Sequence, residues 1–388
     1  MAMHPGLQEG PIYLDYNATT PVDPLVFTAM SPFLSTYFGN PSSTHYYGRG
    51  TREAIEVARG QVALALGCAP DEVVFTGSGS ESDMLAIRGV ALALRERGNH
   101  IITQVTEHPA VLKLCAALTC LHGIRVTYLP VDESGRVNPA NLAAAIDEQT
   151  VLVTIMHANN ETGTVQPIAE LAEIAHRHGV LFHTDASQTV GKIPTNVVAL
   201  GVDLLTVAGH KLYAPKGIGA LYVRRGIQLE PTIYGGGQEM GRRAGTENTA
   251  FMVALGTAAV IAYEQLGLSQ PRLQRLRDHL QQRLEAELPG IVHLNGHPSE
   301  RLPNTLNISI DGVIGEDVLA ATQELAASTG SACHEGNTEP SAVLLAMGLT
   351  RERALGALRL TLGRWSTEDE IERAATAIVR TARKIKRM

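Results

Sequence analysis

The chain has 388 residues, of which 44% are hydrophobic, and a formal net charge of −7. This length and hydrophobic fraction exclude a disordered chain and predict one large core with a smaller second domain. The negative charge excludes the basic surface that attracts nucleic acid or an anionic membrane, so we expect neither as a partner.

The apolar runs and the cysteines help to predict the cellular compartment of the protein. The first eleven residues have no apolar stretch that fits a secretory signal, and the most apolar segment, 251–263, predicts a buried helix rather than a membrane span. The four cysteines lack Cys-x-x-Cys spacing, which argues against a structural zinc site or a disulfide framework. We therefore expect a cytoplasmic protein with free thiols and no bound metal.

Strand-like runs alternate with helical patterns from residue 72 to residue 223. Apolar and β-branched runs predict strands at 72–76, 100–105, 125–129, 151–156, 180–184, 203–208 and 219–223. Helices are predicted between most of these strands. Such alternation predicts a mostly parallel central sheet that helices cover on both faces.

The pattern changes after Tyr263, where a long amphipathic helix is predicted at 270–288. Strand-like runs at 306–310 and 357–362 then alternate with helical patterns at 315–326, 341–347 and 368–386. We predict an α/β fold with a large domain over 16–262. A smaller α+β domain is expected to form from 1–15 and 263–388.

Polar residues follow the carboxyl ends of five predicted strands. In open α/β sheets, ligands bind beyond that edge of the sheet. We therefore expect these side chains to converge on one site. They are Gly79 with Ser80, His108, Asn160, Asp185 with Gln188, and His210 with Lys211.

Two of these residues indicate a particular cofactor. A lysine amine can bind an aldehyde as a Schiff base, and a carboxylate on a neighbouring strand end can pair with a pyridinium nitrogen. Lys211 and Asp185 follow two consecutive predicted strands. The pair indicates pyridoxal 5'-phosphate, although an aspartate at such a position can also cap a helix.

The other polar residues have a cofactor role and a plainer alternative. The glycine-rich turn at 77–80 precedes a predicted helix and can hold a phosphate, or it can simply cap that helix. It lacks the Lys-Ser/Thr ending of a nucleotide-binding P-loop. Asn160 and Gln188 can bind a ring hydroxyl or cap loops, and His108 can stack on a ring and move protons or be structural.

Cys333 is the best nucleophile candidate among the cysteines. It lies in a stretch of small residues, 328–336, between two predicted helices, beside a polar and potentially cationic neighbour. An exposed thiol in such surroundings ionises more readily than a buried one. The other three cysteines lie in apolar surroundings and are expected to be inert core or near-core thiols; they are Cys68, Cys115 and Cys120.

These residues stand within motifs that carry a family resemblance. The motifs are DYNATTP at 15–21, FGNPSS at 38–43, TEH at 106–108, MHANNETG at 156–163, HTDASQ at 183–188, GHK at 209–211, GGGQE at 235–239 and RAGTEN at 243–248. In this order, over nearly the whole chain, they resemble those of cysteine desulfurases. These are fold-type I pyridoxal phosphate enzymes of the class V aminotransferase group. The resemblance therefore implies that fold, with the cofactor on the large domain and the cysteine loop on the small one.

The resemblance also implies roles for the cofactor residues. Lys211 is the Schiff-base lysine, His108 stacks on the ring and acts in catalysis, and Asp185 pairs with the ring nitrogen. Contacts to the ring hydroxyl are implied for Asn160 and Gln188, and contacts to the phosphate for Gly79, Ser80 and His210. Thr246 is expected to reach the phosphate of a neighbouring subunit, which implies a homodimer with shared active sites.

The resemblance implies a substrate and products. Arg359 matches an arginine that grips the substrate carboxylate, with Asn160 beside it, although an arginine here can also form a surface salt bridge. The expected reaction converts L-cysteine to L-alanine, with Lys211 removing the Cα proton and Cys333 taking the sulfur as a persulfide. That sulfur then passes to an acceptor protein, such as an iron-sulfur scaffold.

Three alternatives remain open at this point. Cys333 is followed by His334, as in selenocysteine lyases, so the substrate can instead be L-selenocysteine, with release of selenide. A catalytically silent sulfur-assembly scaffold can keep the fold without the reaction. An aminotransferase or lyase that does not use a thiol would not need Cys333.

Overall fold

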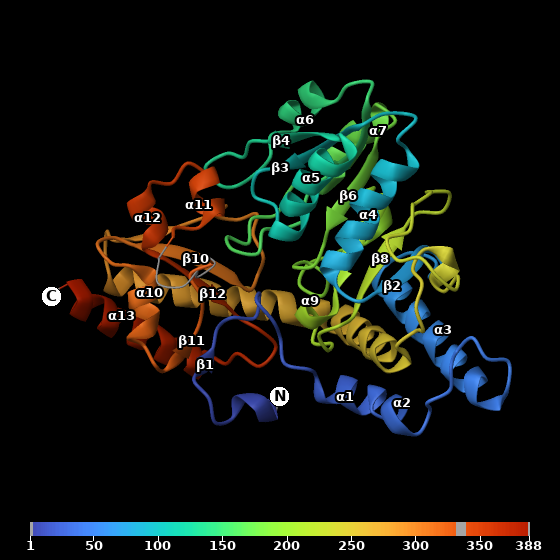
Figure 1. Cartoon of the computed structure of the whole chain (residues 1–388). Helices are drawn as coiled ribbons and strands as arrows, with labels where there is room; N and C mark the ends of the chain where they lie inside the picture. Colours follow the sequence, from blue (N-terminus) through green and yellow to red (C-terminus); the bar gives the residue numbers. More distant parts are fainter. Residues whose placement is uncertain (1–2, 331–338, 387–388) are drawn as a thin grey trace.

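A seven-stranded sheet forms the centre of the larger part of the molecule (Figure 1). The computed structural model describes residues 3–330 and 339–386, so Cys333 lies outside the described residues. In spatial order, the strands are β2 (Val73–Thr76), β8 (Gly219–Val223), β7 (Leu204–Ala208), β6 (Leu181–Asp185), β5 (Thr150–Thr154), β3 (His100–Gln104) and β4 (Arg125–Leu129). Only β8 runs antiparallel to its neighbours in this sheet. The predicted α/β fold with a mostly parallel sheet is confirmed.

Helices cover both faces of this sheet because successive strand residues point to opposite sides. In β2, Val73 and Phe75 belong to one apolar cluster, whereas Val74 belongs to another. The first cluster includes residues of α3 (Tyr46–Leu66), α6 (Pro139–Ala145), α7 (Ile168–Arg177) and α9 (Thr249–Glu287). The second includes residues of α4 (Gly79–Ala93) and α5 (Pro109–His122). Apart from β4, the strands are therefore buried along nearly their whole length, and most have an apolar centre, which made them visible in the sequence.

Three further short helices pack on the side of the first apolar cluster. They are α1 (Pro24–Met30), α2 (Pro32–Ser35) and α8 (Val197–Leu200). In Figure 1, α1 and α2 extend beneath the end of α9 that lies nearer to α3. They carry the chain from the smaller part of the molecule to α3.

A smaller layer of strands and helices forms the C-terminal part. Its sheet has the order β12 (Ala357–Thr361), β10 (Thr305–Ile310) and β9 (Val292–Leu294), and all its pairs are antiparallel. Its helices are α10 (Gly315–Ala320), α11 (Ala342–Ala346), α12 (Arg351–Leu355) and α13 (Glu368–Lys386). Of these elements, β9 and α12 were not predicted, because each is too short to show a periodic pattern.

The N-terminal residues pair with this smaller part. β1 (Ile12–Tyr13) runs parallel to β11 (Leu325–Ala326), and Ile12 and Leu14 belong to its apolar core. The predicted helix at 315–326 was therefore wrong beyond Ala320, where α10 ends. Its last residues are drawn into a strand by a partner more than 300 residues away, which local periodicity does not reveal.

One continuous helix, α9, replaces two predicted helices and runs through Pro271. Ala254, Leu255 and Ala262 pack in the core of the large sheet, whereas Leu273 and Leu280 pack in the smaller core. The predicted boundary at residue 263 therefore falls inside a helix that belongs to both cores, and the division into domains stays a prediction.

Among the described residues, α9 alone is long and apolar enough to cross a membrane by length and composition. It packs against α1, α3 and α13 within the protein. A core helix passes the same test, and the predicted burial of 251–263 agrees with this packing. The placement is that of a core helix.

Candidate active site

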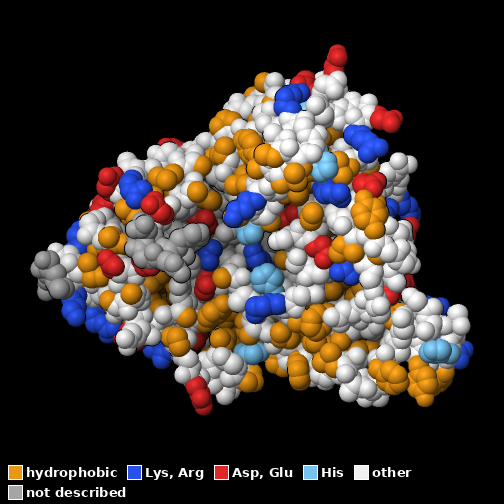
Figure 2. Space-filling view, viewed as in Figure 1, with side chains coloured by type: hydrophobic (Ala, Val, Ile, Leu, Met, Phe, Trp, Pro, Cys, Tyr) orange, Lys and Arg blue, Asp and Glu red, His pale blue; other side chains and the backbone are white. Residues whose placement is uncertain are grey.

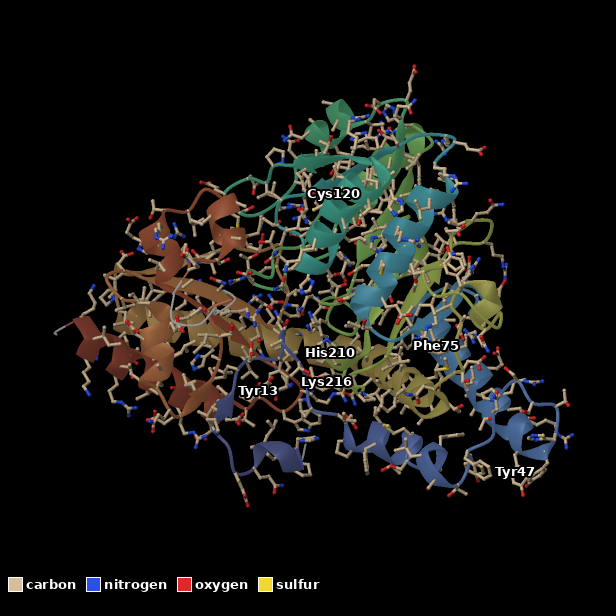
Figure 3. The ribbon with its side chains drawn as sticks, viewed as in Figure 1. Tyr13, Tyr47, Phe75, Cys120, His210 and Lys216 are labelled. Atoms are coloured by element: carbon tan, nitrogen blue, oxygen red, sulfur yellow. The ribbon has the colours of Figure 1, made fainter. Side chains whose placement is uncertain are left out.

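The predicted site residues meet at one edge of the large sheet. Because β2, β3, β5, β6 and β7 are parallel, the segments that follow them open on the same side. Figure 2 shows a hollow between the two parts of the molecule, where histidine, lysine and arginine side chains gather. In Figure 3, His210 and Lys216 lie at this junction, and Lys211 stands next to His210 in a single 3₁₀ turn, Gly209–Lys211, after β7.

Lys211 has the surroundings of a reactive amine. Burial lowers the pKa of its ammonium group, and the charge of Arg359 lowers it further, whereas Asp185 and Asp83 oppose this shift. Among the described residues, no carboxylate lies within ion-pair distance of its Nζ. The amine is thus kept partly buried, without a neutralising contact, where a ligand aldehyde can reach it.

Asp185 is the last residue of β6 and is buried. Its Oδ1 accepts a hydrogen bond from the Ser187 backbone N at 2.8 Å. This is the capping contact that the sequence left open as an alternative. It occupies one carboxylate oxygen, and the second accepts no hydrogen bond from the part of the chain that the structure describes, so it can face a ligand nitrogen.

A second carboxyl group, Asp83 on α4, lies behind Asp185. Burial and the negative charge of Asp185 raise the pKa of Asp83 well above its usual range. His183 Nε2 is 3.8 Å from Asp83 Oδ1, and burial lowers the pKa of His183 to about 4. Burial therefore disfavours the charged form of both groups beside Asp185. Nothing in the sequence pattern singled out Asp83.

His108 is held in one orientation because it caps α5. Its Nδ1 accepts a hydrogen bond from the Ala110 backbone N at 3.1 Å. Burial lowers the pKa of the imidazole, and the charge of Lys211 lowers it further. The adjacent Glu107 accepts hydrogen bonds from Gln104 Nε2 at 3.0 Å and from the Met156 backbone N at 2.6 Å. These contacts tie the ends of β3 and β5 together under the histidine.

The predicted phosphate residues lie where α4 begins. Ser78 caps this helix through a 3.1 Å bond from the Glu81 backbone N. A side chain at Gly79 would bring its first carbon within 3.0 Å of Ala208 Cβ and 3.1 Å of Ser187 Oγ. Glycine is therefore required for this close approach to β7. The first turn of α4, with exposed Ser80, keeps open amide groups at the helix N-terminus.

His210 and Thr246 complete the predicted phosphate set. His210 Nδ1 is 3.2 Å from Thr19 Oγ1, and burial with the nearby charge of Lys211 lowers the pKa of His210 to about 4. Thr246 instead has an exposed side chain in the loop before α9. Buried Glu239 anchors this loop by binding Arg59 Nη1 at 2.8 Å.

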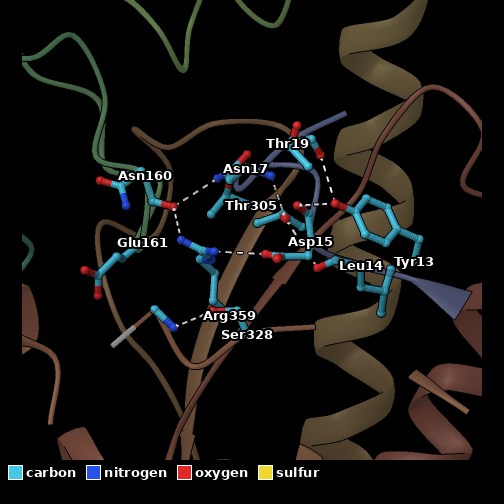
Figure 4. A network of polar contacts seen from close by, with 12 residues as sticks. Tyr13, Leu14, Asp15, Asn17, Thr19, Asn160, Glu161, Thr305, Ser328 and Arg359 are labelled. Carbon is cyan, nitrogen blue, oxygen red and sulfur yellow. Dashed lines mark hydrogen bonds and ion pairs between the residues drawn. The ribbon is translucent and has the colours of Figure 1, made fainter. Parts of the chain in front are cut away.

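Arg359 belongs to β12 and is buried, with 7% of its surface exposed, so the alternative of a surface salt bridge is wrong. Figure 4 shows its guanidinium between Asp15 and Asn160. Nη2 is 2.9 Å from Asp15 Oδ1, and Nη1 is 3.5 Å from the Asn160 carbonyl oxygen. Its Nε is buried without a hydrogen-bond partner among the described residues. An unsatisfied donor in a buried guanidinium suits a carboxylate ligand.

Sequence reasoning missed the polar hub that joins these groups. Asn17, 1% exposed, donates from Nδ2 to the Asn160 carbonyl at 3.1 Å and to Thr305 Oγ1 at 2.9 Å (Figure 4). The backbone carbonyl oxygen of Asn17 accepts a 3.0 Å hydrogen bond from Gln188 Nε2. Buried Lys192 donates to Gln188 Oε1 at 2.9 Å and to Asn17 Oδ1 at 3.3 Å. Asn17 falls inside a quoted motif, but nothing in its spacing shows what it contacts.

The cysteines divide into buried and exposed thiols. Burial raises the pKa of Cys68 and of Cys115 to about 12 each, which agrees with inert thiols. Cys120 is exposed, so its predicted apolar placement was wrong. It stands five residues after Cys115 on α5, which turns it to the solvent side of that helix.

The residues fit pyridoxal phosphate on the observations above. A lysine amine without an ion pair, a buried carboxylate with one free oxygen, and a glycine-lined helix N-terminus face the same edge. These are an aldehyde partner, a ring-nitrogen partner and an anion site, respectively. The structure thus brings together all the described predicted residues except Thr246, which lies exposed in its loop.

Comparisons with known proteins agree with this geometry. A family model described as aminotransferase class V matches residues 12–374. A cysteine desulfurase IscS from Dictyoglomus turgidum is 48% identical and covers 97% of this chain and 95% of its own length. A cysteine desulfurase from Mus musculus is 43% identical and covers 97% and 83%, respectively.

Solved structures give the same picture. A NifS-like protein superposes with a TM-score of 0.90 at 36% identity and covers 96% of this chain and 100% of that one. A structure described as SspA in complex with cysteine has a TM-score of 0.79 at 36% identity and covers 92% and 99%, respectively.

Proposed function

The chain belongs to the class V aminotransferase family, and we propose that it is a pyridoxal-phosphate-dependent cysteine desulfurase. In this reaction, L-cysteine becomes L-alanine and its sulfur passes to Cys333 as a persulfide. The observation that carries the proposal is the placement of Lys211 and Asp185 at the ends of adjacent parallel strands. Relatives named cysteine desulfurase over nearly the full chain support it and bear out the predicted resemblance.

The proposed cofactor would be held by residues from five strand ends. Lys211 would bind its aldehyde, Asp185 would pair with the ring nitrogen, and His108 would stack on the ring. Asn160 and Gln188 would contact the ring hydroxyl. When bound, pyridoxal phosphate withdraws the electron pair that forms at the substrate Cα. The phosphate would be held by Gly79, Ser80, His210 and, from a second copy of the chain, Thr246.

The chain's own groups would then move the proton and the sulfur. Lys211, whose pKa is lowered by burial, would act as the base and take the Cα proton at Nζ. The Cys333 thiolate attacks the substrate sulfur, the substrate Cβ–S bond breaks, and its electron pair stays on carbon. Cβ takes a proton in place of the sulfur, Cα regains the proton held at Lys211 Nζ to complete alanine, and Cys333 carries the extra sulfur.

The substrate carboxylate would bind Arg359 beside Asn160. This guanidinium already binds Asp15, whose pKa is raised by burial, while Arg359 itself opposes that shift. A second carboxylate can use the unpaired Nε without displacing Asp15. Asp15 would therefore orient the arginine while the substrate binds its free edge.

We propose a homodimer, a sulfur-acceptor protein and a cytoplasmic location with this activity. Large apolar side chains are exposed on α1, α2 and α3 and between these helices, which supports burial against a second copy. They include Phe27, Leu34, Phe38, Tyr46 and Tyr47, the last labelled far from the hollow in Figure 3. A persulfide relay to an acceptor such as an iron-sulfur scaffold needs reduced thiols, which the cytoplasm maintains.

The test compares two site variants with a matched thiol control. Lys211→Ala should lose the visible absorbance of lysine-bound pyridoxal phosphate. Cys333→Ser should keep this absorbance but release no sulfide from L-cysteine. Cys120→Ser, which removes an exposed thiol on α5, should match the wild type in both measurements. Sulfide release by Cys333→Ser at the wild-type rate would remove this thiol from the mechanism.

The same assay separates the alternatives. Alanine with sulfide from L-cysteine supports a desulfurase, and a strong preference for L-selenocysteine with selenide release supports a selenocysteine lyase. Pyruvate instead of alanine indicates a lyase that does not use a thiol. A protein without visible absorbance or turnover would be a silent scaffold. That result would contradict the Schiff base that we expect Lys211 to form with the cofactor.

A further inference from the structure

Glu161 is a buried carboxylate that the proposed steps do not use. It lies between β5 and α7, directly after Asn160, and is 8% exposed. Its backbone N donates to Asn159 Oδ1 at 2.9 Å, and its backbone oxygen accepts a 3.2 Å bond from Asn307 Nδ2 on β10. Since both backbone groups are bound, the starting point of the side chain is fixed between the large sheet and the small one.

The carboxylate binds the start of a helix in the smaller part of the molecule. Ser341 Oγ, buried at 2% exposure, donates a short hydrogen bond to Glu161 Oε2. The same serine caps α11, because its Oγ accepts a 3.2 Å bond from the Leu344 backbone N. Glu161 therefore fixes the residue at which the chain enters α11.

The same oxygen also lies close to a second point of the chain. Gly330 has φ +86°, which favours glycine, and a side chain there would place its first carbon 2.7 Å from Glu161 Oε2. The Gly330 backbone N binds Ser328 Oγ at 3.0 Å, and the Ser328 carbonyl accepts a 2.7 Å bond from the Arg359 backbone N. Gly330 is thus held through Ser328 against the strand that carries the proposed substrate arginine, and only glycine leaves room for the Glu161 carboxylate beside it.

The surroundings of Glu161 are those of a buried carboxyl group whose hydrogen bonds have a structural role. Burial raises the pKa of Glu161 to about 7, whereas the hydrogen bond from Ser341 and the charge of Arg359 act to lower it. A buried carboxyl group of this kind is expensive to keep unless its hydrogen bonds are used. The carboxylate binds Ser341 and lies close to Gly330, the described residues near the two sides of 331–338.

We infer that Glu161 is a positioning residue for sulfur transfer, which binds Ser341 and packs against Gly330 beside Asn160 and Arg359. The inference rests on the proposed function, because Cys333 lies between these two points in the sequence. The position of Gly330 limits how far the thiol of Cys333, three residues later in the sequence, can reach. Loss of the anchor should slow the step that needs close approach of two sulfur atoms and spare the binding of cofactor and substrate.

The experiment uses the cofactor-loaded, full-length protein and measures two quantities. One is the change in visible absorbance when L-cysteine binds, and the other is the single-turnover rate of alanine formation. Glu161→Ala and Ser341→Ala should each keep the absorbance change and slow the single turnover by about ten- to a hundredfold. Glu161→Gln keeps an acceptor oxygen for Ser341 and should restore most of the rate.

A double variant and a control separate positioning from loss of a helix cap. Glu161→Ala combined with Ser341→Ala should be no slower than either variant alone, because both remove one shared contact. Thr350→Ala removes the matching cap of the neighbouring helix α12 without touching Glu161, and should leave the rate unchanged.

Two results would overturn the inference. One is a wild-type single-turnover rate in Glu161→Ala, and the other is a double variant whose slowing is the product of the two single effects. If the wild type itself gave no absorbance change with L-cysteine and no alanine, the proposed function would fail instead. The two failures are therefore distinguishable.

Discussion

Replacing Lys192 with methionine should change how stability depends on pH. Lys192 is 8% exposed, and its Nζ binds Gln188 Oε1 and Asn17 Oδ1, neither of which is charged. Burial, together with the charges of Lys211 and Arg359, lowers the pKa of this lysine from its ordinary value of 10.5 to about 7. The unfolded chain restores the ordinary value, so folding and protonation are linked at this residue.

The direction and the size of this pH dependence follow from the pKa values of Lys192 in the folded and the unfolded chain. Between pH 7 and 10.5, the unfolded chain binds more protons at Lys192 than the folded chain, so this residue makes stability rise with pH. Below pH 7, both states are protonated and the cost of burying the charge is present in full. The slope is about 1.4 kcal/mol per pH unit. Lys192→Met removes it, so the free energy of unfolding of the wild type relative to this variant should rise by about 2 to 3 kcal/mol from pH 7 to pH 9.

Urea unfolding of the cofactor-free proteins at pH 6, 7, 8 and 9 measures this difference. The matched control is Lys113→Met, because Lys113 is an exposed lysine on α5. Its difference from the wild type should not change over the same range. A difference for Lys192→Met that is equally independent of pH would refute the reasoning and show that the buried amine keeps its ordinary protonation.

Three further outcomes are expected at other parts of the site. Glu239→Ala should lower the free energy of unfolding by about 3 to 5 kcal/mol in urea titrations, because it leaves the buried Arg59 without its partner; a loss below 1 kcal/mol would contradict this. Arg359→Lys should raise KM for L-cysteine by about tenfold or more while the visible absorbance persists, since lysine cannot offer two parallel donors; an unchanged KM would exclude the arginine from substrate binding. Thr246→Ala should weaken cofactor binding roughly tenfold or more. Mixing it with Lys211→Ala subunits should restore tight binding at one site per dimer, whereas a monomer would show no restoration.

The large sheet was predictable because burial on both faces removes ambiguity. Most strands are short, largely apolar runs, and helical patterns separate most of them. The predicted strand limits differ from those of the structure by at most two residues, and those at 125–129 and 219–223 agree in full. Asp185 and Lys211 could be placed because a strand end locates its next residues without knowledge of distant contacts.

Features that depend on distant partners were not predictable. β11 exists because β1 lies beside it, and the sequence near residue 325 favours continuation of a helix. The continuity of α9 through Pro271 depends on two apolar cores that hold its halves, since proline alone normally ends or bends a helix. Cys120 was misplaced because an apolar helix was taken as buried all round, whereas α5 keeps one side in solvent.

The polar hub around Asn17 was invisible for a related reason, and it bears on how the site works. The groups proposed to hold the cofactor belong to the large sheet, whereas Arg359 belongs to the small one. Apolar contacts alone permit sliding between two surfaces, because they have little direction. Asn17 instead binds Gln188 and the Asn160 carbonyl on one side and Thr305 on the other.

Hydrogen bonds require defined distances and angles, so this single amide fixes the register of the two parts. Glu161 makes an equivalent connection through Asn307 and Ser341. The separation between Lys211 and Arg359 is therefore set by polar contacts that cross the junction. Their loss should affect substrate positioning before it affects the fold of either sheet.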